Sequence, residues 1–297
     1  MSNPWDPIDT LHLGRPKVTA CYLAETTDGL ALVDTGPASA IAGVEQSLAA
    51  RGVSFADIKH LLLTHIHLDH AGAAGTLVRR HPHLQVHVSA IGAPHVVDPS
   101  RLEKSARMLY GEAFDHLWGE LLPVPEDRLH VLGDEVLGLG VFPAPGHAKH
   151  MVNFVHPDGT IYCGDAAGVR IEPGRHILPI TPPPDIDVEG WHATIERIRA
   201  HRPKRLAIAH WGVKDDPDDH LARLAERLDI WTERVGSGVS VDEFTRLDRE
   251  DMAREGGGAS EAYEGAGPLV QCFAGLERYW MKRREREAAE AAGPAGA

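Results

Sequence analysis

The sequence predicts an α/β protein with additional helices at its C-terminal end, and two patterns support this. Up to about residue 213, short apolar runs typical of strands alternate with stretches in which apolar residues recur at helical spacing. Beyond that point helical spacing continues without strand-like runs, as at Leu221, Leu224 and Leu228. We expect one α/β domain over residues 1–213 and a helical extension over 214–290, with a flexible linker at 255–268 and a disordered tail at 291–297.

The first elements predict a small meander followed by a helix. Residues 8–13, 18–25 and 30–33 are typical of short strands, and a turn at Thr27-Asp28-Gly29 joins the last two. Ile41, Val44 and Leu48 then recur at helical spacing until Gly52.

The most informative segment is Leu61-Leu62-Leu63-Thr64-His65-Ile66-His67-Leu68-Asp69-His70-Ala71-Gly72, where an apolar run changes to histidine and aspartate. The leucines predict a strand buried on both faces. Side chains two apart in an extended chain point the same way, so His65 and His67 can bind one ion while Asp69 and His70 serve a neighbouring ion. Imidazole and carboxylate without thiolate suit zinc, iron(II) or manganese. The alternative, polar loop residues in a chain with 19 histidines, fits His81-Pro82-His83 better.

The next elements are a short helix to Arg80, a strand over 84–88 and a helical insertion over 91–123. Strand-like runs over 129–132, 135–137 and 141–142 then lead to Pro143-Ala144-Pro145-Gly146-His147. Residues 152–156 and 160–163 predict a hairpin that ends at Gly164-Asp165, and the chain continues past it through residues 166–171.

A helix containing Val188, Trp191, Ile195 and Ile198 precedes a last strand over 205–209, which ends at His210. Near the C-terminus an apolar stripe recurs at helical spacing and consists of Leu269, Phe273, Leu276 and Trp280. This stripe must be buried either on the core or on another subunit, so a homo-oligomer is possible through these helices.

Composition narrows the function classes. The 297 residues are 43% hydrophobic, which is ample for a packed core, and the formal net charge of −13 argues against nucleic acid as a partner. No run approaches a membrane span and the N-terminus lacks a signal-peptide pattern, so we expect a cytoplasmic protein with no membrane partner. Cys21, Cys163 and Cys272 are far apart and odd in number, which argues against disulfides.

The order of motifs resembles the metallo-β-lactamase-fold metallohydrolase superfamily. The resemblance rests on the histidine-rich segment followed by Pro145-Gly146-His147, Gly164-Asp165 and Ala209-His210, and it covers roughly residues 10–213. It implies a four-layer αββα sandwich of two mixed sheets flanked by helices. It also implies that the insertion at 91–123 overhangs the site.

The resemblance further implies the ligand set. Two divalent ions, first of all zinc with iron or manganese as alternatives, would be held by His65, His67 and His147 and by Asp69, His70 and His210, with Asp165 between them. Asp34 has two interpretations: it orients a ligand, or it only forms a turn. Roles in substrate contact for His150 and Arg170 stay open.

The expected function is hydrolysis of a small-molecule ester, thioester or lactone by a metal-bridging hydroxide, with Asp69 as a proton carrier. The carboxylate at position 165 argues against antibiotic hydrolysis, and His67 excludes the flavodiiron pattern, which has Glu there. The residues after Asp165 depart from the glyoxalase II branch. The alternatives are a mononuclear iron enzyme similar to persulfide dioxygenases, a phosphodiesterase or nuclease, and a metal-binding protein without turnover.

Overall fold

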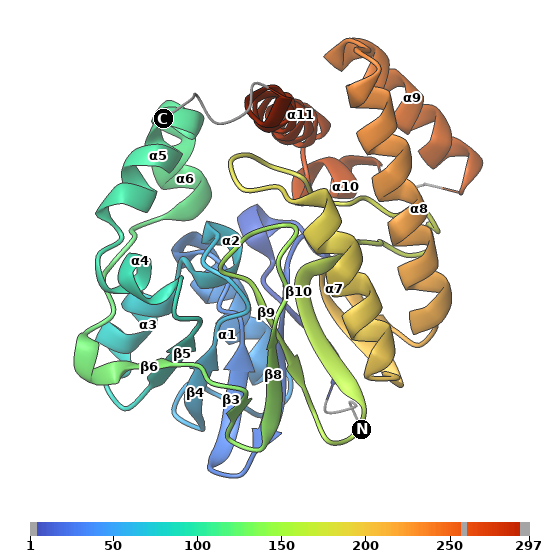
Figure 1. The fold of residues 1–297 in the computed structure, drawn as a ribbon. Coiled ribbons are helices and arrows are strands. Elements are labelled where there is room, and N and C mark those ends of the chain that lie inside the picture. Colours follow the sequence, from blue (N-terminus) through green and yellow to red (C-terminus); the bar gives the residue numbers. More distant parts are fainter. Residues whose placement is uncertain (1–4, 257–259, 292–297) are drawn as a thin grey trace.

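A computed structural model describes residues 5–256 and 260–291, and it confirms the α/β class with two sheets flanked by helices (Figure 1). The first sheet has the order β1-β2-β3-β4-β5-β6, and the second has the order β12-β11-β10-β9-β8-β7. Both sheets are mixed. In the first, β1, β2 and β3 pair antiparallel, and β3, β4, β5 and β6 pair in parallel. In the second, β10 and β11 pair in parallel and all other neighbours pair antiparallel.

The strands of the first sheet are β1 (Ile8–Asp9), β2 (Ala20–Thr26), β3 (Gly29–Val33), β4 (Ile58–Leu62), β5 (Gln85–Val88) and β6 (Leu129–Val131). Those of the second are β7 (Glu135–Val136), β8 (Leu139–Pro143), β9 (Val152–Val155), β10 (Thr160–Val169), β11 (Arg205–His210) and β12 (Gly212–Lys214). The helices up to residue 200 are α1 (Ile41–Ala49), α2 (Leu68–Ala71), α3 (Ala74–Arg80), α4 (Ala93–Val97), α5 (Ser100–Tyr110), α6 (Phe114–Trp118) and α7 (Val188–Ala200). The C-terminal helices are α8 (Pro217–Gly236), α9 (Val241–Arg254), α10 (Ser260–Ala266) and α11 (Leu269–Ala291).

Three apolar clusters explain the four layers. Neighbouring residues on a strand point to opposite faces, so in β4 Leu62 packs between the two sheets, whereas Leu61 packs against α1 and α3 on the outer face. On the far side of the second sheet, Ile208 packs with Trp191 of α7 and Trp231 of α8. The central strands of each sheet are therefore covered on both faces, and β10 is buried along its whole length, whereas β6 at the edge of the first sheet is partly exposed.

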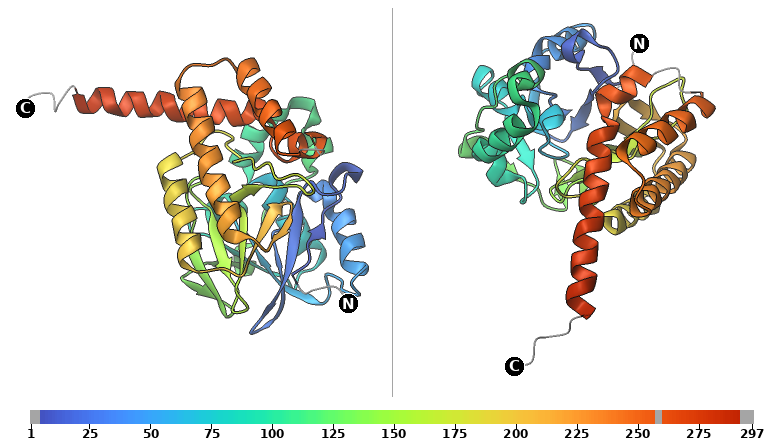
Figure 2. Two further views of the ribbon diagram at one scale, coloured as in Figure 1. Left: turned by 90° about the vertical axis from the view of Figure 1, so that its right-hand side faces the viewer. Right: turned by 90° about the horizontal axis from the view of Figure 1, so that it is seen from above.

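The C-terminal helices are fixed to the second sheet by apolar contacts and by buried charges. Trp231 of α8 is fully buried, and its indole nitrogen donates to the Asp248 carboxylate of α9 at 2.9 Å. Leu276 of α11 is buried in the same cluster, so the apolar stripe packs on the core. The C-terminal part of α11 projects away from the body of the molecule (Figure 2). Among the described helices, none is long and apolar enough to cross a bilayer.

Two expected elements differ in the structure. The first strand stops at Asp9, because the Asp9 carboxylate accepts hydrogen bonds from the backbone nitrogens of Leu11 and Lys17, and Leu11 itself has a φ of 48°. Within the expected linker 255–268 lies α10, where fully buried Tyr263 donates a hydrogen bond to the His176 carbonyl at 2.7 Å. Of the expected disordered tail, residues 292–297 lie outside the described residues, and Ala291 ends α11.

Candidate metal centre

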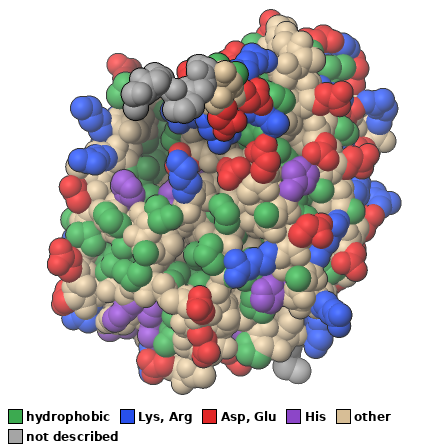
Figure 3. All heavy atoms as spheres, in the orientation of Figure 1, with side chains coloured by type: hydrophobic (Ala, Val, Ile, Leu, Met, Phe, Trp, Pro, Cys, Tyr) green, Lys and Arg blue, Asp and Glu red, His purple; other side chains and the backbone are tan. Residues whose placement is uncertain are grey.

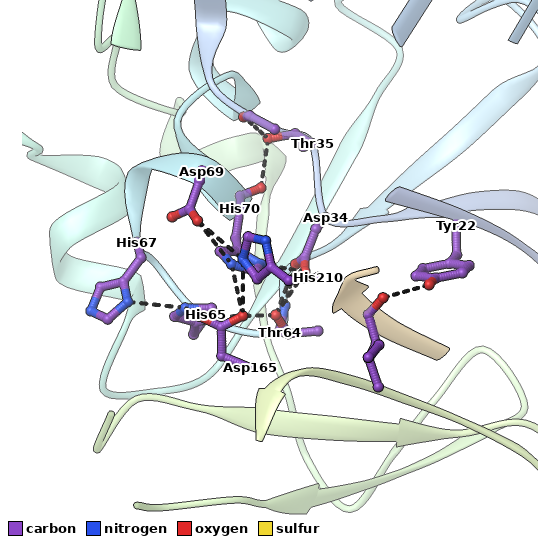
Figure 4. Close-up of polar contacts among 12 residues, drawn as sticks. Tyr22, Asp34, Thr35, Thr64, His65, His67, Asp69, His70, Asp165 and His210 are labelled. Atoms are coloured by element: carbon purple, nitrogen blue, oxygen red, sulfur yellow. Dashed lines mark hydrogen bonds and ion pairs between the residues drawn. The ribbon is translucent and has the colours of Figure 1, made fainter. Parts of the chain in front are cut away.

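The seven predicted ligands come from both halves of the chain and meet at one edge of the sandwich. Figure 4 shows how those other than His147 lie. His65 and His67 lie in the loop after β4, and Asp69 and His70 lie in α2 directly behind it. From the second half of the chain come the remaining three, His147 in the β8–β9 loop, Asp165 in β10 and His210 at the end of β11. Loops after strands, the end of β11 and an interior position of β10 thus bring together residues that are far apart in sequence.

The first ligand set consists of His65, His67, His147 and Asp165, whose candidate ligand atoms all lie within 4.8 Å of one another. The Nδ1 atom of His67 is 3.1 Å from Nε2 of His65 and 2.8 Å from Nε2 of His147. Asp165 Oδ2 is 3.3 Å from the same atom of His147. A tetrahedral ion with ligand bonds of ~2.0–2.1 Å has ligand–ligand edges of roughly 3.3 Å, so these four atoms fit around one ion.

The second set consists of Asp69, His70 and His210, and Asp165 completes it. The other oxygen of Asp165, Oδ1, is 3.2 Å from His70 Nε2 and 3.3 Å from His210 Nε2. Asp69 Oδ2 is 3.4 Å from each of these nitrogens. Asp165 therefore offers one carboxylate oxygen to each set, which is the arrangement a bridging ligand requires.

Unsatisfied polar atoms support a fit to cations. His70 Nε2, His210 Nε2 and Asp165 Oδ1 are buried and have no hydrogen-bond partner. Buried polar atoms rarely stay unpaired, and three that face one point are typical of a metal site. The ring nitrogens that point away from the centre make hydrogen bonds. Nδ1 of His147 donates to the Ile180 carbonyl at 2.7 Å, and Nδ1 of His210 donates to the Val18 carbonyl at 2.6 Å. Each bond leaves the Nε2 lone pair facing the centre.

Asp34 connects the two sets, which favours its interpretation as an orienting residue. Its Oδ2 accepts from His70 Nδ1 at 2.9 Å and from the Thr64 hydroxyl at 2.8 Å, and its Oδ1 accepts from the Thr64 backbone nitrogen at 2.8 Å. The Thr64 oxygen lies 3.1 Å from His65 Nδ1 and can accept its proton. One buried carboxylate thus holds His70 directly and His65 through Thr64. This role of Thr64 was not predicted, although a hydroxyl directly before a ligand histidine is a signal for it in the sequence.

The two sets differ in protonation when no ion is bound. Burial, together with neighbouring histidines, lowers the pKa of His65 and His67 well below the usual range. Burial alone would also lower the pKa of His210, but Asp165 and Asp69 outweigh it and raise that pKa to about 9. Cations that bind the second set must therefore displace a proton from it.

Asp165 lies within a strand, whereas the sequence predicted that it ends one. β10 runs on to Val169, and its register against β11 shifts on both sides of Gly164. Gly164 has a φ of 49°, and a Cβ atom there would lie 2.5 Å from the Thr64 hydroxyl. Glycine permits both this backbone conformation and the close approach, so the irregularity brings Asp165 beside the loop that carries His65.

Other residues flagged in the sequence lie around the centre. His150 is 9% exposed, its Nδ1 accepts from the Ile66 backbone nitrogen at 3.4 Å, and its ring stacks 6.0 Å from that of His65. The Arg170 guanidinium is bound to both oxygens of Asp216 at 2.8 and 2.9 Å, so it is engaged in an ion pair. The expected insertion forms α4, α5 and α6 beside the centre (Figure 1).

Comparisons with known proteins agree with this geometry. The family model of the metallo-beta-lactamase superfamily matches residues 14–210. Among curated proteins, the metallo-beta-lactamase fold-containing protein ST1585 of Sulfurisphaera tokodaii is 28% identical over 64% of this chain and 74% of its own length. The lactamase-like protein adaB of Aspergillus niger is 32% identical over 52% of this chain and 51% of its own length.

Solved structures share the fold. The crystal structure of ST1585, described as an archaeal metallo-beta-lactamase superfamily protein from Sulfolobus tokodaii, matches with a TM-score of 0.64 at 21% identity and covers 93% of this chain and 97% of its own. TTHA1429 of Thermus thermophilus matches with a TM-score of 0.62 at 21% identity over 91% of this chain and 89% of its own. TTHA1623, solved in a di-iron-bound form, matches with a TM-score of 0.51 at 24% identity over 70% of this chain and 93% of its own.

Proposed function

Because the chain belongs to the metallo-beta-lactamase superfamily and its His and Asp side chains form two adjoining ligand sets, we propose that it is a hydrolase that uses two divalent ions, first of all zinc. The proposed substrates are small-molecule esters, thioesters or lactones. The observation that carries the proposal is the position of Asp165, which has one carboxylate oxygen beside each set.

The residues fit the chemistry of such a centre. Two bound cations would lower the pKa of a shared water towards neutrality and polarise the carbonyl oxygen under attack. The chain holds the imidazoles in one tautomer through Ile180, Val18 and Asp34, so their inward nitrogens are available as ligands. Asp69 is 24% exposed, whereas Asp165 is 3% exposed, so Asp69 is the carboxylate that can exchange a proton with solvent.

Two other reactions use the same fold and stay as alternatives. A mononuclear iron enzyme similar to persulfide dioxygenases needs the first set only, and the complete second set of Asp69, His70 and His210 favours the dinuclear hydrolase. A phosphodiesterase or nuclease would have to bind a polyanion, which the formal net charge of −13 disfavours.

The test combines metal analysis with a substrate panel. The purified protein is expected to contain two ions per chain and to hydrolyse at least one neutral ester, thioester or lactone, with activity lost on chelation and recovered with zinc. Iron at one per chain with oxygen consumption on a persulfide, or turnover of a phosphodiester alone, would refute the proposal. The control for both measurements is an Arg246→Gln variant. It loses only the exposed pairs that Arg246 makes with Glu243 and Glu250 on α9, so its metal content and activity should match those of wild type.

A further inference from the structure

Ile180 is the residue that orients His147 in the first ligand set. Its backbone carbonyl accepts from Nδ1 of His147 at 2.7 Å, which leaves the lone pair on Nε2 free for an ion. Ile180 is buried and lies in the loop over residues 170–187, between β10 and α7. A loop carbonyl can fix an imidazole only if the loop itself is fixed, so the position of His147 depends on what holds Ile180.

The C-terminal helix α11 holds this loop next to Ile180. The hydroxyl of fully buried Thr181 donates to the Cys272 carbonyl of α11 at 2.9 Å. Cys272 and Gly275 are three residues apart and therefore lie on the same side of the helix. A Cβ atom at Gly275 would be 1.8 Å from the Thr181 carbonyl oxygen. The helix thus accepts a hydrogen bond from Thr181 and, at Gly275, leaves room for its backbone.

Other hydrogen bonds hold the loop further from Ile180. Leu178 pairs with β10 through two backbone hydrogen bonds of 2.9 and 3.0 Å, and the backbone nitrogen of Asp187 donates to the β8–β9 loop at 2.9 Å. Between them, the prolines at 182–184 have no backbone N–H to donate. Of these contacts, the bond from Thr181 to α11 is the nearest to Ile180, so it has the most direct effect on where the Ile180 carbonyl lies.

The helix α11 packs on the rest of the protein with one side. Its buried residues are Leu269, Cys272, Gly275, Leu276 and Tyr279. Acidic and basic side chains, in contrast, gather on the surface over the C-terminal helices (Figure 3). The helix also lies beyond residues 14–210, which the family model matches. A segment outside the matched region therefore holds the loop that orients a ligand within it.

We infer that Thr181 is a positioning residue for His147, and that α11 thereby sets the affinity of the first ligand set for its ion. While the Thr181 hydroxyl is bound to α11, the Ile180 carbonyl stays where it accepts from His147. The second set is oriented instead by the Val18 carbonyl and the Asp34 carboxylate. The two ions should therefore respond differently when the contact with α11 is broken. The inference rests on the proposed function, because it concerns an ion of the same site.

Competition titration with a chromophoric chelator, on the full chain and without substrate, measures the two affinities for zinc. His67→Ala removes a ligand of the first set and so identifies the step that belongs to the first ion. Thr181→Val keeps the shape and removes the donor, and it is expected to weaken the first ion about three- to tenfold and to change the second less than about twofold. The loss is smaller than the roughly 10–100-fold typical of a direct partner, because Thr181 acts through Ile180. Thr181→Ser, which keeps the hydroxyl, should bind both ions as wild type does.

Tyr279→Phe is the matched control, because this hydroxyl also ties α11 to the body of the protein but donates to Glu189 of α7 at 2.7 Å. It should leave both affinities unchanged. Gly275→Ala, whose Cβ would push against the Thr181 carbonyl, is expected to weaken the first ion as well. A merely structural loss would weaken both ions equally or appear equally in Tyr279→Phe. Either of those results, or an unchanged first ion in Thr181→Val, would overturn the inference.

The titration separates this inference from the proposed hydrolysis, because it uses the metal alone. Selective weakening of the first ion in Thr181→Val supports the positioning role even if wild type hydrolyses no ester, thioester or lactone, in which case only the proposed function fails. Unchanged zinc affinities in Thr181→Val, with hydrolysis by wild type established, refute the positioning role alone.

Discussion

Replacing Asp34 by asparagine changes a single buried group that serves both ligand sets. The carboxylate is 2% exposed and accepts from His70 Nδ1, from the Thr64 hydroxyl and from the Thr64 backbone nitrogen. Asparagine keeps the shape and tolerates the φ of 58° at this position. Its oxygen can still accept from the backbone of Thr64, so the amide group is turned towards His70 and the Thr64 hydroxyl.

The second set is expected to lose more affinity than the first. An amide N–H can only donate, so His70 would have to present a bare Nδ1 to it and carry its proton on Nε2, the atom that faces the centre. Loss of such an orienting partner typically weakens metal binding about 10–100-fold, or roughly 1.4–2.7 kcal/mol. His65 is held by Thr64 rather than by Asp34, so the first ion should be weakened less.

Competition titrations with a chromophoric chelator measure both affinities. The expected result is two tight ions in wild type and one tight and one weak ion in Asp34→Asn, with a parallel loss of activity at limiting zinc. Asp28→Asn is the matched control, because this aspartate also bonds a histidine, His60, but lies in the exposed turn between β2 and β3 and belongs to neither ligand set. Two unchanged affinities in Asp34→Asn would refute the orienting role.

Three further changes test other parts of the structure. His67→Ala removes a half-buried ligand that lies outside the apolar clusters, so it should abolish both tight binding of the first ion and activity. The thermal midpoint of the chelator-treated variant should stay within a few degrees of that of wild type. An active, metal-free variant would contradict the mechanism. Asp165→Asn replaces the carboxylate by an amide, which has only one oxygen and cannot offer one to each ligand set. Metal analysis should therefore find one tight ion, and an unchanged stoichiometry of two would show that Asp165 does not bridge the ions. Burial and the neighbouring His60 and His130 lower the pKa of His87 to about 4, so the folded protein binds fewer protons than the unfolded chain below the ordinary value of 6.5. Stability should therefore fall as the pH is lowered from 6.5 towards 4, by about 2 kcal/mol from this group at pH ~4.5. Urea unfolding of His87→Phe should show a smaller loss over that range, and an identical pH profile would rule this contribution out.

The parts of the fold that depend on local pattern could be predicted from the sequence. The apolar run 61–63 lies at the end of β4 and is buried, and the helical spacing of Val188, Trp191 and Ile195 becomes α7. The ligand motifs could be recognised because each follows such a run, and strand ends of neighbouring strands meet at one edge of a sheet.

The parts that depend on contacts between distant residues could not be predicted. Asp165 lies inside β10 because Gly164 is drawn close to Thr64, a contact that no local pattern encodes. The composition around α10 is typical of a linker, yet Tyr263 finds buried carbonyl partners in the loop after β10.

The division of the ligands between the two sheets has a consequence for assembly. His65, His67, Asp69 and His70 follow the first sheet, whereas His147, Asp165 and His210 belong to the second. A nascent N-terminal half can offer an ion only part of its coordination shell, and tight retention must wait until both halves have docked. Cations bound here would therefore hold the two docked halves together. A misassembled molecule would be distinguished by its failure to retain metal.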